Sequence, residues 1–159
     1  MPASDYVRAL RARVGRDLLL LPGASALIFD DAGRVLLQRR GDSGRWSVIG
    51  GGVDPGETPA EAAVREAREE TGLDVEPARL VGVYATPEIT YPNGDRCAYV
   101  VTAFRCRVVG GTLRPDGDES LELAWFDPAA LPPMRLDLRQ RVLDAVPERG
   151  EAAWQRDGL

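Results

Sequence analysis

The feature that most constrains this chain is the segment of residues 51–73, which reads GGVDPGETPAEAAVREAREETGL. Three helix-start signals stand together in it. Thr58 can cap a helix, Pro59 fits the first helical position, and Glu61 can close a capping box with Thr58. A glycine follows the last helical position, as is common at helix ends. The segment therefore predicts a helix over 59–71.

A glycine-rich stretch over 50–57 leads into this helix. Gly50-Gly51-Gly52 lets the backbone approach a ligand closely because these residues have no side chain. Asp54-Pro55-Gly56 is typical of a sharp turn. We therefore expect a loop at 50–57, joined directly to the helix through Glu57.

The residue spacing assigns two faces to the predicted helix. Small apolar side chains that recur at three- and four-residue spacing indicate the face that packs on a sheet; they are Ala60, Ala63, Val64 and Ala67. The carboxylates of Glu66, Glu69 and Glu70 recur at the same spacing on another face and repel one another. A divalent cation would reverse that repulsion. The alternative is an ordinary solvated face, stabilised by ion pairs such as Glu61–Arg65 and Arg65–Glu69.

The composition removes several kinds of catalysis. All 20 basic residues are arginine, and the chain has no histidine and two cysteines. Catalytic triads, Schiff-base lysines, P-loop lysines and histidine-ligated or four-cysteine zinc sites are therefore excluded. The remaining catalytic groups are mainly carboxylates, which suit Mg²⁺ or Mn²⁺. The net charge of −5 does not favour nucleic-acid binding.

Other features predict a cytoplasmic protein. Cys97 and Cys106 fall in or near one apolar segment and are expected to be free thiols, as in a reducing compartment. The first fifteen residues carry acidic and basic side chains and do not resemble the apolar core of a signal peptide. The apolar run at 18–22 is too short to span a bilayer, so no membrane partner is expected.

The rest of the chain predicts a mixed α/β layered domain. Periodicity and turn signals predict further elements in this order: a helix over 4–14, a hairpin of strands within 23–39, a short strand at 46–49, strands over 79–86, 97–109 and 121–127, and a helix over 135–146. With no linker or repeat in between, we expect one domain over 1–159, made of an N-terminal helix and lead-in (1–22), a core (23–147) and a tail (148–159).

Segment 51–73 resembles the Nudix box, a pattern of glycine, five residues, glutamate, seven residues, Arg-Glu, an aliphatic residue, any residue, Glu-Glu, any residue, glycine and an aliphatic residue. The matching positions are Gly51, Glu57, Arg65, Glu66, Ala67, Glu69, Glu70, Gly72 and Leu73. The flanking residues 36–40 and 125–126 are also similar to those of the family. The resemblance implies a Nudix-type α/β/α sandwich with a mixed β-sheet between helices.

The resemblance also implies an activity. Nudix enzymes hydrolyse the pyrophosphate bond of a nucleoside diphosphate derivative, such as ADP-ribose, a nucleotide sugar, a nucleoside triphosphate or a dinucleoside polyphosphate. It implies Mg²⁺ (or Mn²⁺) bound by three box glutamates and a loop carbonyl: Glu66, Glu69, Glu70 and Gly50. Arg65 would orient the glutamates, and Glu57 would support the metal cluster. Two or three ions would neutralise the diphosphate and lower the pKa of bound water.

The carboxylate that takes the proton of water varies across the family. Glu66 is one candidate, and an acid from the loop before the last strand is another. That loop and strand offer Asp118, Glu119 and Glu122. We favour Glu119, as base and further metal ligand, with Glu122 second.

The residues that bind the substrate are less constrained. Arg39 and Arg40 could meet phosphates, and Trp46 and Tyr91 could stack on a base. The partner is a small-molecule nucleotide, and the 4–14 helix or Trp154 could contribute to a homodimer. The alternative function is a catalytically weak nucleotide-sensing module with the same fold.

Overall fold

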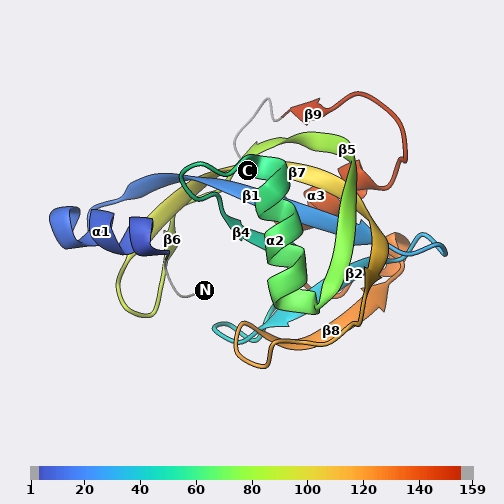
Figure 1. The fold of residues 1–159 in the computed structure, drawn as a ribbon, viewed down its shortest axis with the longest axis horizontal. Coiled ribbons are helices and arrows are strands. Elements are labelled where there is room, and N and C mark those ends of the chain that lie inside the picture. The colour runs from blue at the N-terminus through green and yellow to red at the C-terminus, as the bar shows by residue number, and fades with distance from the viewer. Residues whose placement is uncertain (1–3, 155–159) are drawn as a thin grey trace.

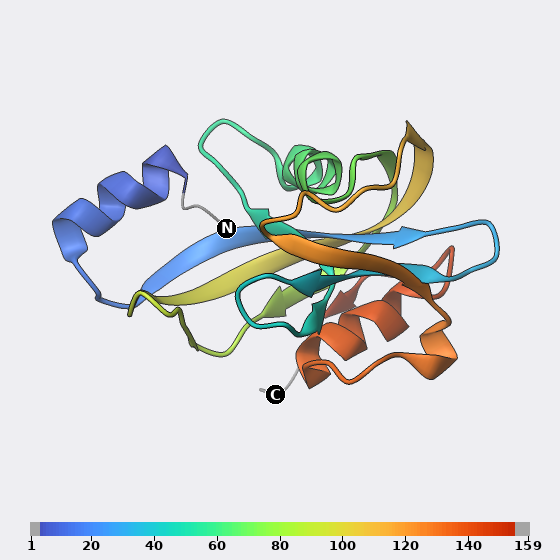
Figure 2. The ribbon, with the colours of Figure 1, turned by 90° about the horizontal axis from the view of Figure 1, so that it is seen from below.

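The computed structural model describes residues 4–154, which form a mixed sheet with helices on both of its faces (Figures 1 and 2). The helices are α1 (Asp5–Val14), α2 (Pro59–Thr71) and α3 (Leu136–Ala145), with a 3-10 helix at Pro128–Ala130. The strands are β1 (Leu19–Phe29), β2 (Val35–Arg40), β3 (Trp46–Ser47), β4 (Ile49–Gly52), β5 (Leu73–Ala85), β6 (Ile89–Thr90), β7 (Arg96–Gly111), β8 (Ser120–Phe126) and β9 (Ala153–Trp154).

Strand β1 organises the sheet. It runs parallel to β7 over its whole length and antiparallel to β4 and β2, and the predicted hairpin of β1 and β2 is confirmed. On one side, β7 pairs with β5, and β5 pairs with β9. On the other side, β2 pairs with β3 and β8. This order brings β2, β4 and the start of β8 close to the helix that carries the box.

The two faces of the sheet have separate apolar cores, which confirms the predicted α/β/α sandwich. Alanines of α2 pack on Ala24, Ala26 and Ile28 of β1. On the opposite face, α3 packs through Leu138 and Val142 on a second cluster that includes Leu37. Leu36 lies in the α2 cluster and Leu37 in the α3 cluster, so alternate residues of β2 point to opposite faces.

Helix α1 confirms the predicted N-terminal helix. The Val7 amide donates to the Ser4 hydroxyl at 3.4 Å, as expected of an N-cap. The helix buries none of its residues and extends away from the sheet (Figure 2). It is attached at its end by Arg11, whose guanidinium donates to the carbonyl of Arg96 on β7 at 2.6 Å.

Three predicted boundaries were wrong. Gly50–Gly52 belong to strand β4, not to a loop, because they pair with residues 23–25 of β1. Strand β5 begins at Leu73, directly after α2, and accommodates Pro77 at a register shift. Within the described part of the predicted tail, Trp154 belongs to the sheet, since it pairs with Val83 of β5. Within residues 4–154, none of the helices has the length and apolarity needed to cross a membrane.

Candidate active site on the capped helix

Helix α2 begins and ends as its sequence predicts. The Glu61 amide donates to the Thr58 hydroxyl at 3.3 Å, and the Glu61 carboxylate accepts from the Thr58 amide at 2.8 Å. Gly72 ends the helix in the left-handed region, at φ 72°. A Cβ there would lie 2.5 Å from the carbonyl oxygen of Thr112, so only glycine fits this end.

The face of α2 that meets the sheet differs from the prediction. Ala63 and Ala67 are buried as expected, but Ala62 is buried as well, whereas Ala60 and Val64 are half-buried and line a groove. Small side chains at the buried positions let the helix lie close to β1 and β4. The buried face also carries Glu66 and Glu70, which are 3% and 2% exposed. Two of the three box carboxylates therefore lie at the interface between helix and sheet.

Arg65 connects the acids of the box to one another. Its Nε donates to Glu57 at 2.8 Å and its Nη1 to Glu66 at 2.7 Å. The same Nη1 reaches Glu69 at 3.3 Å, and Nη2 reaches the carbonyl of Gly52 at 3.0 Å. Hydrogen bonds from Arg65 lower the pKa of Glu57. Of the two ion pairs predicted for Arg65, the one with Glu69 is present, whereas Glu61 is used in the helix cap.

Glu70 reaches from α2 to the sheet. Its Oε2 accepts from the backbone amide of Gly50 at 3.0 Å and from Nε2 of Gln38 at 3.0 Å. Gly50 adopts φ 148°, and a Cβ at this position would lie 2.2 Å from the carbonyl oxygen of Ala24. The glycine therefore allows β4 to approach β1 while its amide binds the Glu70 carboxylate.

Glu119 lies near enough to Glu66 and Glu70 to raise the pKa of both carboxyls. Burial raises the pKa of Glu70 to about 8, and the charges of Glu66 and Glu119 act in the same direction. The pKa of Glu66 is raised mainly by burial and also by Glu69 and Glu119. Burial also raises the pKa of Glu119. Neighbouring carboxylates of this kind are hard oxygen donors, which fit Mg²⁺ or Mn²⁺.

The predicted ligands are not yet gathered into a closed cluster. In the described part of the chain, no group of three acidic or cysteine side chains stands at metal-binding distance. Arg65 holds Glu66 and Glu69, and the Glu69 side chain is more than half exposed. In this arrangement Glu69 interacts with Arg65, so the predicted ligand set is not assembled around one point.

The structure separates the candidates for the base. Glu119 lies at the start of β8, within electrostatic reach of Glu66 and Glu70. Glu122 pairs with Arg39 of β2 at 3.2 Å, in register with a residue that points to the α3 face. Asp118 is exposed in the preceding loop. Of the candidates before and within β8, the geometry brings Glu119 to the carboxylates of α2.

Two predicted substrate-binding residues, Arg39 and Trp46, lie away from the carboxylates because side chains alternate between the two faces along β2. Arg39 and Trp46 are register partners, and Trp46 packs edge-on against Phe126 at 4.9 Å within the α3 cluster. Both therefore lie on the sheet face opposite to Glu70. This placement does not favour the predicted roles of Arg39 at a phosphate and of Trp46 at a base, which stay predictions.

Arg40 and Tyr91 lie on the side of the carboxylates. The guanidinium of Arg40 donates to Asp42 at 2.9 and 2.7 Å, which raises the pKa of Arg40, and the charges of Glu70 and Tyr91 add to this effect. Tyr91 follows β6 and its hydroxyl lies 3.0 Å from that of Tyr99. Arg40 thus lies within electrostatic reach of Glu70, and Tyr91 within electrostatic reach of Arg40.

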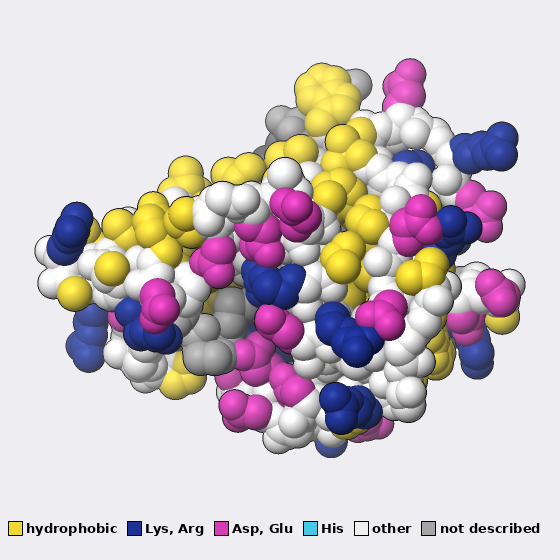
Figure 3. Space-filling model, in the orientation of Figure 1, with side chains coloured by type: hydrophobic (Ala, Val, Ile, Leu, Met, Phe, Trp, Pro, Cys, Tyr) yellow, Lys and Arg dark blue, Asp and Glu magenta, His cyan; other side chains and the backbone are white. Residues whose placement is uncertain are grey.

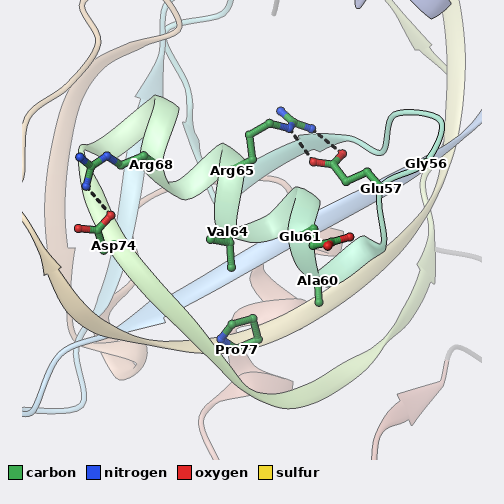
Figure 4. A pocket seen from close by; sticks show the side chains of 9 residues that line it. All are labelled: Gly56, Glu57, Ala60, Glu61, Val64, Arg65, Arg68, Asp74 and Pro77. Atoms are coloured by element: carbon green, nitrogen blue, oxygen red, sulfur yellow. Dashed lines mark hydrogen bonds and ion pairs between the residues drawn. The ribbon is translucent and has the colours of Figure 1, made fainter.

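A groove of about 760 Å³ lies on another side of α2, between the helix and β5 (Figure 4). Its lining includes Val64, Pro77 and the ion pairs of Arg65 with Glu57 and of Arg68 with Asp74. Glu66 and Glu70 are absent from this lining, and the groove shares Glu57 and Arg65 with the candidate active site.

Sequence reasoning missed two residues that contact the site. Gln38 is fully buried and donates to Glu70. Ser120 is also fully buried, and its hydroxyl donates to the amide oxygen of Gln38. A signal was present, because a glutamine follows three apolar residues in the predicted strand. A polar side chain at such a position needs buried partners.

Comparison with known proteins agrees with this geometry. Residues 19–146 match the family model of the NUDIX domain. The chain is 34% identical over 122 residues to a putative 8-oxo-dGTP diphosphatase of Bacillus subtilis, covering 77% of this chain and 76% of that protein. It is 36% identical over 120 residues to an ADP-ribose pyrophosphatase of Methanocaldococcus jannaschii, covering 74% and 68%. A solved MutT NUDIX hydrolase from Burkholderia pseudomallei superposes with a TM-score of 0.63 at 30% identity, covering 79% of this chain and 98% of that one.

Proposed function

Because this chain belongs to the Nudix family and is a pyrophosphohydrolase of that family, we propose that it hydrolyses the pyrophosphate bond of a nucleoside diphosphate derivative with the help of Mg²⁺ or Mn²⁺. The observation that carries the proposal is the pair of buried carboxylates on α2, Glu66 and Glu70, of which Glu70 accepts from the Gly50 amide of β4. A fold that only needed a helix on a sheet would place apolar side chains there.

The residues that would hold the metal are Glu66, Glu69, Glu70, Glu119 and the carbonyl of Gly50. All of them offer oxygen atoms, and the chain has no histidine to compete for the ion. When bound, Mg²⁺ would neutralise the diphosphate and make the attacking water more acidic. The space-filling view shows acidic and arginine side chains gathered over and beside α2, on the face where such a substrate would bind (Figure 3).

The protein's own groups would then hold the reactants and move the proton. Arg65, anchored to Glu57 and to the Gly52 carbonyl, fixes the start of the helix relative to β4. Glu119 would accept the proton of the attacking water, with Glu66 as the other candidate. The water oxygen bonds to one phosphorus, the bridging P–O bond breaks, and the leaving phosphate takes the bond's electrons.

Arg40 and Tyr91 are the proposed contacts to the substrate. Arg40 would meet the phosphates, because it is a cation close enough to Glu70 for the charge of Glu70 to raise its pKa. Tyr91 would lie along the base or sugar. The relatives' names favour two substrate classes, ADP-ribose and an oxidised purine nucleoside triphosphate. Nucleotide sugars and dinucleoside polyphosphates belong to the same chemical set.

The test is a panel of these nucleotides with Mg²⁺ or Mn²⁺, with release of AMP, pyrophosphate and phosphate measured. Excess EDTA should abolish hydrolysis and added metal should restore it; cleavage that ignores EDTA would remove the metal from the proposal. The panel should include a capped RNA, because one relative is the NAD-capped RNA hydrolase NudC of Vibrio atlanticus, 32% identical over 117 residues. Binding without turnover across the panel would favour the sensing module instead.

The homodimer stays a prediction, supported by the distribution of apolar side chains. Leu20, Val83, Val100 and Trp154 are exposed on neighbouring strands. Figure 3 shows hydrophobic side chains in a band from α1 along the edge of the molecule. Light scattering of the purified protein measures the assembly directly. A location in the cytoplasm likewise stays a prediction.

A further inference from the structure

Gln38 occupies an unusual position for a primary amide. It lies on β2, it is fully buried, and it faces α2 rather than solvent. Burying an amide without hydrogen-bond partners is costly. Gln38 avoids that cost through three contacts: its Nε2 donates to the Val48 carbonyl at 3.2 Å and to Glu70 at 3.0 Å, and its Oε1 accepts from the Ser120 hydroxyl.

These contacts fix the orientation of the amide. A primary amide has two N–H donors and one carbonyl acceptor. Both donors are used, by the carbonyl of Val48 and the carboxylate of Glu70, and the acceptor meets the hydroxyl of Ser120. Turning the amide over would place its oxygen against two other oxygens. The Gln38 amide therefore has a single favourable orientation.

The contact with Glu70 selects one carboxylate oxygen. Within the described residues, the donors to Glu70 are Gln38 and the Gly50 amide, and both bind Oε2. Oε1 is then the atom that remains for a cation. Both donors are neutral, so they orient the carboxylate without cancelling its charge. An arginine in place of Gln38 would neutralise Glu70 and compete with the metal.

The contact with Ser120 also links Gln38 to the turn that carries Glu119. Ser120 directly follows Glu119, and its amide donates to Asp116 at 2.8 Å within the turn that precedes β8. The Glu119 carbonyl accepts from the amide of Gly41 at 2.9 Å, which ties the same turn to the end of β2. One buried side chain thus connects the strand, the helix carboxylate and the turn that carries Glu119.

We propose that Gln38 is a positioning residue for the metal site: its amide holds Glu70 in the ligating orientation and, through Ser120, sets the distance of Glu119 from Glu70. The proposal rests on the proposed function, because it takes Glu70 and Glu119 to be ligands. Side chains that orient metal ligands in this way typically change metal affinity or activity by 10–100-fold when they are replaced.

The main variant is Gln38→Met, which keeps an unbranched side chain of similar size and removes every hydrogen bond of the amide. Mn²⁺ binding is measured without substrate, by electron paramagnetic resonance or calorimetry, and the Mg²⁺ concentration for half-maximal hydrolysis is measured separately. We expect the dissociation constant for Mn²⁺ to rise about 10–100-fold, with a parallel rise in the half-maximal Mg²⁺ concentration. Wild-type Mn²⁺ affinity in a folded Gln38→Met protein would overturn the proposal.

Two further variants separate positioning from packing. Ser120→Ala keeps both amide donors and frees only the amide oxygen, so Mn²⁺ affinity should fall less than in Gln38→Met. If Gln38→Met does not fold, unchanged Mn²⁺ affinity in Ser120→Ala counts against the proposal. Tyr84→Phe removes a buried hydrogen bond to Asp144 on the α3 side and serves as the matched control; it should lose stability with no change in Mn²⁺ affinity.

The failure of the two proposals can be distinguished. A wild-type protein that neither binds Mn²⁺ nor hydrolyses nucleotides contradicts the proposed function. A wild-type protein that binds Mn²⁺, together with a Gln38→Met variant that binds it equally well, contradicts only the role of Gln38.

Discussion

Replacing Glu70 by glutamine should make the metal-free protein more stable while removing its activity. The two side chains have nearly the same shape, and the glutamine oxygen can still accept from Gly50 and Gln38 at the positions that now bind Oε2. The variant therefore removes a charge without removing the two hydrogen bonds. Its effect on stability depends on what that charge costs the folded state.

The cost follows from the raised pKa of Glu70. Burial, and then the charge on Glu66, raise this pKa from 4.5 to about 8. At about 1.36 kcal/mol for each pKa unit, keeping the carboxylate ionised costs the metal-free fold roughly 4 kcal/mol at pH 8. Because the folded-state pKa of this acid is raised, the stability is fully present below pH 4.5 and is lost as the pH rises through about 8.

The assay is chemical denaturation of the wild type and Glu70→Gln in EDTA at pH 5 and pH 8. Relaxation around the ionised carboxylate lowers its cost, so we expect the variant to be more stable by at least about 2 kcal/mol at pH 8 and by much less at pH 5. Added Mn²⁺ should stabilise the wild type, by about 2.7 kcal/mol at one hundred times the dissociation constant, and leave the variant unchanged. Glu122→Gln, at an exposed ion pair, is the control and should change little.

Turnover is measured on the same samples. Loss of a charged ligand should reduce it by orders of magnitude in Glu70→Gln, even though the protein is more stable. A variant that is less stable than the wild type at pH 8, or a wild type whose stability is the same at pH 5 and pH 8, would refute the reasoning about the buried charge. Near-wild-type turnover would refute the assignment of Glu70 to the metal.

Two other predictions concern neighbouring positions. Glu119→Gln should lower kcat by about 10²–10⁴-fold, as expected on loss of a general base. Glu122→Gln, on the opposite sheet face, should keep most of the activity. Steady-state kinetics with saturating metal compare the two variants, and the reverse ranking would move the base to Glu122. Gly50→Ala should destabilise the protein by about 2 kcal/mol or more because its Cβ would meet the Ala24 carbonyl at 2.2 Å. In Gly52→Ala, on the same strand, the Cβ meets nothing within 4 Å, so this variant should melt near the wild type. Equal melting temperatures of the two variants would show that β4 can shift.

The local sequence predicts the helix of the box closely because its signals are local. The cap, the first proline and the terminal glycine act within a few residues, so Thr58, Glu61 and Gly72 appear where expected. The strand boundaries were less well predicted. The pairing of Gly50 with Ser25 and of Trp154 with Val83 depends on partners far away in the chain, and no short-range pattern reports it.

In the candidate site, too, local sequence predicts some features and long-range contacts decide the others. The sequence alone determined which acids stand on one side of a helix, Glu66, Glu69 and Glu70, because helical spacing is fixed by the backbone. Only the tertiary structure decided which residues of the sheet join them. Neighbouring residues of a strand point to opposite faces, so the register of β2 brings Gln38 to Glu70 and turns Arg39 away. Register is set by contacts between strands distant in sequence, so the spacing of residues along β2 could not reveal it.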